Sequence, residues 1–375
     1  MKSIKQMLIK EFLQIRRDRL MMPIILVAPI IQVILLGYAA TVDVRNIGLA
    51  VCDMDNSPDS RALVTRFTNT GYFTVTGWAK EPDGVDEYLN ASEAVIGIVI
   101  PRGFGRDISS GRTSTLQLIA DGADANTANI SLNYARQITV GYSQGLLVEQ
   151  VRRLGGGRQV PQITPVTRVW YNPELRSANY MVPGVVALIL MIITTTFTSA
   201  SIVKEREIGT MEQLLVTPMK PSQLLLGKLL PYVLIGLVDV LLTLGVAVNW
   251  FDIPLKGSVI TLFGLSGLFI LTTLGLGLFV STISHTQQQA MMTAQFFVFF
   301  PMIFLSGFTF PIENMPAAIQ VITYLVPLRY FLEIIRGLFL KGVGMETLWP
   351  EALALLVFGV TILSLSVSRF QKRLA

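Results

Sequence analysis

Long apolar runs separated by short polar connectors dominate the second half of the chain. A membrane-spanning helix needs about 20 consecutive, mostly apolar residues. Five runs after residue 178 approach or exceed that length, and one more follows a charged N-terminal segment. Six membrane-spanning helices are therefore predicted over residues 20–42, 179–203, 223–248, 258–281, 290–306 and 348–368.

Residues 43–178 have a different pattern, because short strand-like stretches alternate there with amphipathic ones. Strands are expected at 46–53, 72–78, 94–101 and 115–121. Helices are expected at 57–69, 82–92 and 127–154. Alternating strands and helices predict an α/β layer fold. The predicted fold class is thus a membrane protein with an all-α transmembrane bundle of six helices and an inserted soluble α/β domain. Acids and bases roughly balance in the insert, which argues against a nucleic-acid surface.

Residues 1–19 have the periodicity of an amphipathic helix. The apolar stripe consists of Ile4, Leu8, Phe12 and Ile15. The polar face consists of Gln6, Lys10, Gln14 and Arg17. This pattern predicts a helix lying on an anionic membrane surface. The alternative is a solvated start to the first span.

Composition supports the membrane assignment. Only 15% of the 375 residues are charged, against about 25% in soluble domains, and the mean hydropathy is +0.56. The single cysteine, Cys52, excludes an internal disulfide and a multi-cysteine zinc site. The single histidine, His285, removes most histidine-based catalysis. The N-terminal apolar run is long enough to span, so no cleavable signal peptide is expected.

The distribution of lysine and arginine predicts the orientation, because these residues gather on the cytoplasmic side. Basic residues flank the spans at the N-terminus, in the connector after residue 203 and at the C-terminus. The connector after the third span has Lys256 as its single base. Both termini and the 204–220 connector are therefore predicted to be cytoplasmic. Residues 43–178 would then be an extracytoplasmic domain.

Residues 307–341 are apolar but contain three prolines that interrupt any single helix. The interpretation is a pair of short helices over 311–341 that dip into the outer leaflet and return. Arg329, Glu333 and Arg336 recur at helical spacing and predict a charged face. Such a face needs protein or water beside it. A plain interfacial loop is the alternative.

Motifs for catalysis are absent from the sequence. "LLLGKLLP" contains a Gly-Lys pair but lacks the upstream glycine and the Ser or Thr of a phosphate-binding loop. Neither a G-x-S-x-G nor an H-E-x-x-H motif occurs. Asp53 and Asp55 follow a predicted strand and could bind a cation. Turn chemistry is favoured instead, with Asn56 or Ser57 capping the next helix.

The connector "IVKEREIGTMEQLLVTPMK" at 202–220 is unusually rich in charge. Its apolar positions, Ile208, Met211 and Leu215, lie on one helical face and its acids on the other. Gly209 suggests a close approach or a bend, and Thr217-Pro218 ends the helix. These features predict a short amphipathic helix over 204–217. A membrane anchor alone would favour bases, so a docking helix is the better interpretation.

This connector resembles the signature of permeases in the type-2 ABC exporter family. The family pattern is K-E-R-E-x-G-T-x-E-x-L-x-x-T-P, followed by G-K at the start of the next span. The chain matches it at Lys204, Glu205, Arg206, Glu207, Gly209, Thr210, Glu212, Leu214, Thr217, Pro218, Gly227 and Lys228. "GLAVCDMDNSPDSRALVTRF" is similar to the start of the large outside domain of a drug-efflux-like subgroup.

The resemblance implies a permease that is not an enzyme by itself. ATP and Mg would bind a separate ABC ATPase subunit, and this chain would hold no cofactor or metal. The matched residues from Lys204 to Pro218 would couple the two subunits. The family works as two permeases, in a homodimer or a paralogous heterodimer, with two ATPases. Arg329, Glu333 and Arg336 would belong to an outer gate. In some relatives a periplasmic adaptor and an outer-membrane channel continue the route.

The substrate is less well indicated. The second and fifth spans carry apolar, Thr and Ser residues that suit amphiphilic, drug-like or lipid-like compounds. Asp239 in the third span must face protein or water. It is either a polar point on the substrate path or dimer seam, or an acid hydrogen-bonded to a neighbouring helix. Export of a polysaccharide or an ion is an alternative, and so are a secondary transporter and a membrane sensor.

Overall fold

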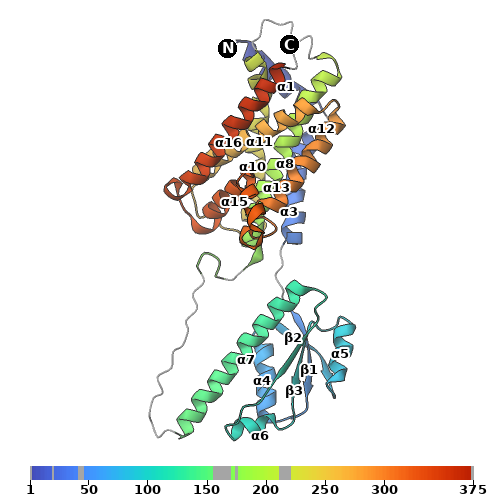
Figure 1. Cartoon of the computed structure of the whole chain (residues 1–375), viewed down its shortest axis with the longest axis vertical. Helices are drawn as coiled ribbons and strands as arrows, with labels where there is room; N and C mark the ends of the chain where they lie inside the picture. The colour runs from blue at the N-terminus through green and yellow to red at the C-terminus, as the bar shows by residue number, and fades with distance from the viewer. Residues whose placement is uncertain are drawn as a thin grey trace. The chain divides into compact units, whose positions relative to one another are not determined.

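The computed structural model describes residues 2–18, 21–40, 46–154, 170–173, 176–210 and 221–372. The chain divides into two compact units (Figure 1). The larger unit combines Met1–Val42 with Arg168–Ala375, and the smaller unit is Asp43–Thr167. The predicted limits of the insert, 43–178, differ from those of the smaller unit mainly at the C-terminal end.

The smaller unit contains a four-stranded mixed sheet with the order β2-β1-β3-β4. Its strands are β1 (Ile47–Asp53), β2 (Phe73–Ala79), β3 (Ile96–Ile100) and β4 (Gln117–Ala120). The β1 strand pairs in parallel with β2 and β3, whereas β4 is antiparallel to β3. The four strands predicted from the sequence are thus found. The first six residues of β1 are buried, as expected for a strand covered on both faces.

Helices cover both faces of this sheet (Figure 1). One face packs against α4 (Pro58–Asn69) and α7 (Ala125–Leu154) through a core that includes Phe67. The other face packs against α5 (Asp83–Asn90) through a smaller core that includes Val85. A Cβ on Gly97 would lie 2.2 Å from a Val85 methyl group, so glycine lets α5 approach the sheet. A further helix, α6 (Phe104–Ser109), was not predicted.

The larger unit is a helical bundle. Its long helices are α8 (Ser177–Glu207), α10 (Pro221–Asn249), α11 (Val259–Ile283) and α16 (Met345–Lys372). Its shorter elements are α1 (Lys2–Arg17), α2 (Met21–Leu26), α3 (Ala28–Ala40), α12 (Gln287–Thr293), η1 (Ala294–Phe299), α13 (Phe300–Leu305), η2 (Ile312–Asn314), α14 (Ala317–Thr323), α15 (Pro327–Arg336) and η3 (Gly337–Lys341). Figure 1 places α1 and the C-terminal end of α16 at the same end of the bundle, which we call the α1 end.

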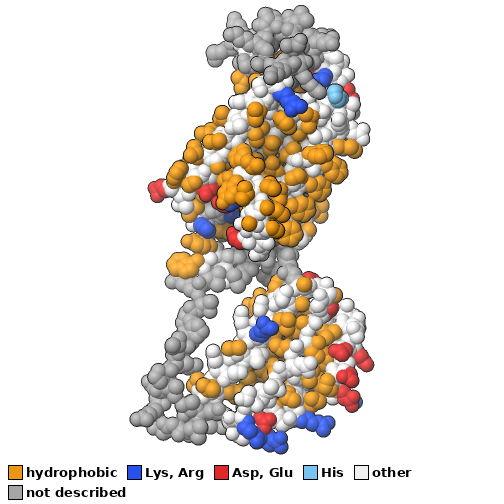
Figure 2. Space-filling view, viewed as in Figure 1, with side chains coloured by type: hydrophobic (Ala, Val, Ile, Leu, Met, Phe, Trp, Pro, Cys, Tyr) orange, Lys and Arg blue, Asp and Glu red, His pale blue; other side chains and the backbone are white. Residues whose placement is uncertain are grey.

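The α8 helix lies at the centre of the bundle, since 83% of its most apolar 18-residue stretch is buried. It contacts α3, α10, α11, α12 and α15. Gly277 of α11 lies against α8 so closely that a Cβ there would be 2.7 Å from the Thr195 carbonyl oxygen. Nearby, the Thr194 and Thr273 hydroxyls are hydrogen-bonded at 2.7 Å. The outer surface is apolar, and Figure 2 shows hydrophobic side chains covering much of the visible face of the bundle.

Among the described residues, five helices are long and apolar enough to cross a membrane. The number rises to six if the pair Ala317–Thr323 and Pro327–Lys341, bent by 78°, is counted as one span. The five correspond to the predicted second, third, fourth, fifth and last spans. The predicted first span is not one unbroken helix, because α2 and α3 meet at Val27. Pro29 lacks an N–H and crowds the carbonyl four residues earlier, which explains this break.

The predicted fifth span also departs from a regular helix. Its middle, η1, has π-helical geometry and precedes Pro301. A π-turn accommodates a proline that cannot donate in the regular ladder. The pair of short helices predicted over 311–341 is found as α14 and α15, which lie at an angle to each other. The η2 turn precedes α14, and η3 continues α15. Their position relative to a membrane leaflet stays a prediction.

Candidate functional site

The charged motif begins inside α8 and not in a separate helix. Lys204 to Glu207 form the last turn of α8, which then ends at Ile208. Gly209 has φ +81° and donates its N–H to the Arg206 carbonyl at 3.2 Å. A positive φ favours glycine because it has no Cβ. The prediction of one helix over 204–217 is therefore wrong at its start, whereas the predicted bend at Gly209 is confirmed.

Four further residues of the predicted coupling set, Glu212, Leu214, Thr217 and Pro218, lie outside the described residues. The remaining members lie at the α1 end of the bundle, where the side chains from Lys204 to Glu207 contact other helices of the same chain. Thr210 is the last described residue before the gap. Its hydroxyl donates a hydrogen bond to Glu205 Oε2.

A buried ion-pair network joins the KERE sequence at the end of α8 to the Gly-Lys pair of α10. Lys228 Nζ lies 3.3 Å from Glu205 Oε1 and 3.3 Å from Glu11 Oε1. Lys10 Nζ is 2.9 Å from Glu205 Oε1. Lys228, Glu11 and Glu205 are only 1%, 2% and 4% exposed. Burying charge costs several kcal/mol per ion, so each of these groups requires its partners. We call Lys10, Glu11, Glu205 and Lys228 the charge network.

The glycine of the Gly-Lys pair permits this arrangement. A Cβ on Gly227 would lie 2.7 Å from Met7 Cγ, so α1 packs directly on the α10 backbone. The buried face of α1 consists of Met7, Glu11 and Ile15. Of the predicted stripe Ile4, Leu8, Phe12 and Ile15, Ile15 is buried and Phe12 is 40% exposed, so the face that packs on the bundle is not the whole stripe. Glu11 can occupy the buried face because Lys228 compensates its charge. Contact of the stripe with a membrane surface stays a prediction.

The other three charges of the KERE sequence bind different helices. Lys204 Nζ lies 3.6 Å from Asp18 Oδ2, just after α1. Arg206 donates to the Ser281 and Ser284 carbonyls, both at 3.2 Å, at the end of α11. Glu207 accepts from the backbone and side-chain nitrogens of Gln287, both at 3.1 Å, at the start of α12. The four motif charges thus connect the end of α8 to α1, α10, α11 and α12.

A cavity of about 210 Å³ opens beside this network. Residues of α1, α2, α8, α10 and α12 line it. Its polar side includes Glu11, Asp18 and Lys204, and its apolar side includes Phe197 and Met291. The cavity therefore lies where α8 and α12, from the predicted second and fifth spans, come together.

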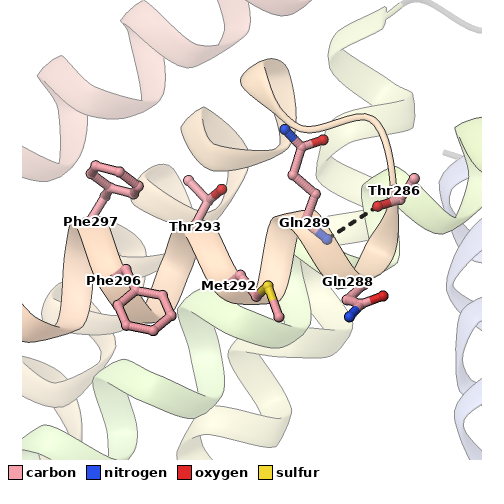
Figure 3. A pocket seen from close by; sticks show the side chains of 7 residues that line it. All are labelled: Thr286, Gln288, Gln289, Met292, Thr293, Phe296 and Phe297. Atoms are coloured by element: carbon pink, nitrogen blue, oxygen red, sulfur yellow. Dashed lines mark hydrogen bonds between the residues drawn. The ribbon is translucent and has the colours of Figure 1, made fainter.

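The fifth span presents an exposed face of its own. Figure 3 shows two rows along this helix, Gln288, Met292 and Phe296 on one side and Gln289, Thr293 and Phe297 on the other. Thr286 caps α12 by accepting a hydrogen bond from the Gln289 N–H at 3.2 Å. The two rows line a shallow groove of about 500 Å³. Phe297 is 78% exposed, and only 11% of the most apolar 18-residue stretch of this span is buried.

Asp239 lies inside α10 and is 1% exposed. Neither carboxylate oxygen has a hydrogen-bond partner among the described residues. This differs from the interpretation of an acid hydrogen-bonded to a neighbouring helix. A place for Asp239 on the substrate path or at the dimer seam stays a prediction.

Arg329, Glu333 and Arg336, the residues predicted for an outer gate, lie on α15, where Glu333 is exposed and Arg336 is partly buried. Arg329 stacks on the Tyr324 ring, with 4.1 Å from Cζ to the ring centroid. Arg336 lies 3.7 Å from the Tyr180 ring centroid of α8. The buried side of α15 reaches the core of the bundle through Phe331, whose ring stacks on Phe269 at 4.2 Å.

Asp53 and Asp55 are satisfied by donors of the chain itself. Asp53 accepts from the Asn56 N–H at 2.9 Å and from the Ser60 hydroxyl at 2.6 Å. Asp55 accepts from the Gly103 and Gly105 N–H groups at 2.7 and 2.8 Å. Hydrogen bonds from Ser57 and Gly105 hold the pKa of Asp55 below its usual value.

Ser57 caps α4, as predicted. No cluster that could hold a metal ion occurs among the described residues. Turn chemistry therefore explains the two carboxylates Asp53 and Asp55.

The acidic partners of Lys228 and Lys204 were not identified from the sequence. Glu11 and Asp18 were not singled out because α1 was expected to bury an apolar stripe. A signal was present: Glu11 lies at helical spacing between Met7 and Ile15. An acid on an otherwise apolar face indicates a buried partner.

Comparison with known proteins adds a consistent result. A family described as ABC-2 family transporter protein matches residues 19–367. "Probable multidrug ABC transporter permease YbhR" from Escherichia coli K12 is 33% identical over 365 residues, covering 97% of each chain. "Probable multidrug ABC transporter permease YbhS" from the same organism is 33% identical, covering all of this chain and 98% of the relative. "Inner membrane transport permease YhhJ", also from this strain, is 28% identical and covers 99% of this chain.

Proposed function

The chain belongs to the ABC-2 family of transporter proteins, as the membrane permease of an ATP-binding-cassette transporter, and we propose that it exports an amphiphilic, drug-like or lipid-like compound. It is not an enzyme itself, and the family implies an ABC ATPase partner and a dimeric arrangement. Two similar proteins are named multidrug permeases, which supports the substrate class. ATP and Mg would bind the ATPase and not this chain.

The proposed orientation places the α1 end in the cytoplasm. The bases of α1, of the last turn of α8 and of the end of α16 gather toward this end, and bases favour the cytoplasmic side. Both termini would then be cytoplasmic, and residues 43–178 would be extracytoplasmic. A bacterial inner membrane would contain the protein.

The charge network carries the proposal for coupling. The ATPase would dock on residues that follow Gly209, at 210–220, where the family motif continues. The neighbouring charges, from Lys204 to Glu207, are already engaged with α1, α10, α11 and α12. A displacement of the connector would therefore move several helix ends together. A coupling role is therefore proposed for the ten motif residues Lys204, Glu205, Arg206, Glu207, Gly209, Thr210, Glu212, Leu214, Thr217 and Pro218.

The substrate path would run between α8 and the α12–η1 segment. Ile192, Thr196, Phe197 and Ser201 are the partly exposed positions of the otherwise buried stretch at 187–201 of α8. They lead toward the 210 Å³ cavity, which Phe197 and Ser201 line. The exposed aromatic face of η1 would contact a second copy, in a homodimer or a paralogous heterodimer. Asp239 would give this path a buried polar point, and Arg329, Glu333 and Arg336 would form part of its outer gate.

The smaller unit would recruit a periplasmic adaptor, and through it an outer-membrane channel. Two exposed features support this proposal. Tyr72 and Tyr134 stack at 4.3 Å beside Arg66, and tyrosine and arginine are enriched in binding hot spots. Leu147 of α7 is 64% exposed, beyond Tyr142, the last α7 residue packed against the core of this unit.

Purification of the tagged chain in a gentle detergent tests the exporter proposal. Mass spectrometry should find a stoichiometric nucleotide-binding subunit with it. A second readout is transport into inverted vesicles, which should require hydrolysable ATP. If no ATPase is found even after cross-linking in intact membranes, the secondary-transporter and sensor alternatives must be reopened.

A further inference from the structure

Exposed tryptophan and tyrosine side chains of the larger unit gather at the end of the bundle opposite α1. Trp349 lies near the start of α16, whose other end is at the α1 end. Trp250 directly follows α10, which packs on α1 near its own start, at Gly227. The whole set, between 41% and 64% exposed, consists of Tyr38, Trp170, Tyr171, Tyr180, Trp250 and Trp349. We call these six residues the aromatic belt.

Contacts among the belt residues and their neighbours place them at a common level. Trp250 Nε1 donates to the Tyr38 hydroxyl at 3.2 Å, which joins the ends of α10 and α3. The Tyr171 carbonyl accepts from Lys256 Nζ at 3.3 Å, in the connector that follows Trp250. Segments from three distant parts of the chain therefore present aromatic side chains at the same end of the bundle.

The α1 end has a different surface. No exposed tryptophan or tyrosine lies there among the residues that the structure describes, whereas α1 exposes Lys5, Arg16 and Arg17. Tryptophan and tyrosine are enriched where hydrocarbon meets head groups, because their rings are apolar and carry one polar group. Trp250 comes 22 residues after Lys228 of the charge network, which is about 33 Å along a helix. The hydrocarbon core of a bilayer is about 30 Å thick, so the spacing fits two membrane interfaces.

Both connections to the smaller unit begin at the aromatic belt. Tyr38 shortly precedes the smaller unit, Asp43–Thr167, and Trp170 shortly follows it. The returning chain is fixed to the start of α8, because the Asn172 side chain accepts from the Arg176 N–H at 3.2 Å and donates to the Arg176 carbonyl at 2.9 Å. The belt residues thus lie where the chain enters and leaves the bundle.

Tyr324, at the end of α14, is an exposed tyrosine of the larger unit that lies outside the belt. Its carbonyl accepts from the Tyr330 hydroxyl at 2.9 Å, and the Tyr330 ring lies 5.9 Å from the Phe358 ring. Phe358 comes nine residues after Trp349 on α16, which is roughly 13 Å along the helix. The bend between α14 and α15 therefore lies nearer to the middle of the bundle than the belt does.

We propose that the aromatic belt binds the head-group layer of one bilayer leaflet and holds both connections to the smaller unit in that layer. The rings would enter the edge of the hydrocarbon, with indole N–H and phenol groups toward the lipid head groups. With the orientation proposed above, this is the extracytoplasmic leaflet. The bend after Tyr324 would then lie in the hydrocarbon of the same leaflet. The inference rests on the membrane placement in the proposed function, and not on its substrate or its ATPase.

Quenching of tryptophan fluorescence at two depths tests the proposal. The full chain is placed in phosphatidylcholine vesicles whose acyl chains carry bromine either near the head group or near the chain end. Three of the four tryptophans belong to the aromatic belt, and the fourth is Trp78 of the smaller unit. The native chain should therefore lose more fluorescence to the shallow bromine than to the deep one. Trp78→Phe should increase the fraction of the fluorescence that bromine quenches.

Variants with a single tryptophan assign the result to each position. Trp170, Trp250 and Trp349 are kept one at a time, with Phe at the other positions, and each should be quenched more by the shallow bromine. The control is Val360→Trp in a chain with Phe at all four positions. Val360 is 53% exposed and lies eleven residues after Trp349 on α16, so the deep bromine should quench it more. Tyr324→Trp in the same background should behave like this control.

Equal or stronger quenching by the deep bromine at Trp250 or Trp349 would overturn the proposal. Insensitivity of Trp170 to both lipids would also overturn it, because the return from the smaller unit would then lie in water or against protein. A shallow position of Tyr324→Trp would refute the placement of the bend. If the multiple replacements prevent folding, the native chain still decides, since most of its tryptophans belong to the belt. No ATPase takes part in the measurement, so failure of the exporter proposal would leave its result unchanged.

Discussion

Lys228 Nζ lies 3.3 Å from Glu205 Oε1, although the two residues belong to different helices and are separated by the charged connector. Both residues match the family motif, one in KERE and the other in the following Gly-Lys pair. Their contact explains why the motif continues beyond the connector. The charges hold the ends of α8 and α10 together, with α1 as the third member.

Replacement of Lys228 should test the energetic weight of this contact. Lys228→Met leaves Glu11 and Glu205 buried without their shared cation, which should cost about 3–5 kcal/mol. Adding Glu11→Gln should recover part of that loss, because one uncompensated charge is removed. Thermal unfolding of the purified protein measures both effects. Additive losses in the double variant would contradict the network.

Gly227 should tolerate no side chain. Gly227→Ala would force α1 away from α10, since its Cβ would lie 2.7 Å from Met7 Cγ, and overpacking costs about 1–3 kcal/mol. Gly245→Ala is the matched control on the same helix, because no atom lies within 4 Å of its Cβ position. Proteolysis of α1 should accelerate in the first variant only. Equal rates in both would argue against close packing of α1.

The turn at Gly209 should be essential for transport. Gly209→Pro imposes a φ near −65° where the chain has +81°. Transport should be lost while insertion into the membrane is retained, and Glu212→Ala should have the same result if the connector docks on the ATPase. Vesicle transport and membrane fractionation measure the two properties. Export at the wild-type rate in both variants would reject the coupling assignment.

The orientation can be checked with cysteine reporters. A cysteine at position 90 should be labelled from the periplasm, because Asn90 is exposed in the smaller unit. A cysteine at position 213 should be labelled from the cytoplasm only. A membrane-impermeant maleimide on intact and lysed cells distinguishes the two. The reverse pattern would invert the proposed topology.

The lowered pKa of Asp55 predicts that the stability of the smaller unit depends on pH. Hydrogen bonds from Ser57 and Gly105 lower its pKa from 3.8. A carboxyl group whose pKa is lower in the folded state than in the unfolded state stabilises the fold at pH values above its pKa in the unfolded state. This stabilisation is lost as the pH falls through the pKa of the folded state. Labelling of buried Cys52 with a dithiodipyridine, in the full chain, should therefore accelerate in acid. In Asp55→Asn the labelling of Cys52 should be faster than in the wild type at pH 7. The further increase of the labelling rate in acid should be smaller than in the wild type.

Much of the fold could be predicted because periodicity is local. The strands of the smaller unit and four long helices follow from runs of apolar residues, and the start of α4 follows from its cap, Ser57. The break at Val27 and the π-turn before Pro301 could not be located, because proline distorts helices in several ways. The charge network could not be predicted because it joins residues as far apart as Lys10 and Glu205.

The most direct test of the account compares transport per ATP hydrolysed in proteoliposomes of the permease with its ATPase. Glu205→Gln keeps hydrogen-bonding groups for Thr210 but removes the charge that Lys228 and Lys10 share. Glu313→Gln, on the exposed η2 turn, is the control. We predict that Glu205→Gln retains the ATPase and its hydrolysis but transports several-fold less substrate per ATP, with Glu313→Gln unchanged. An unchanged ratio in Glu205→Gln would contradict a role of the charge network in coupling.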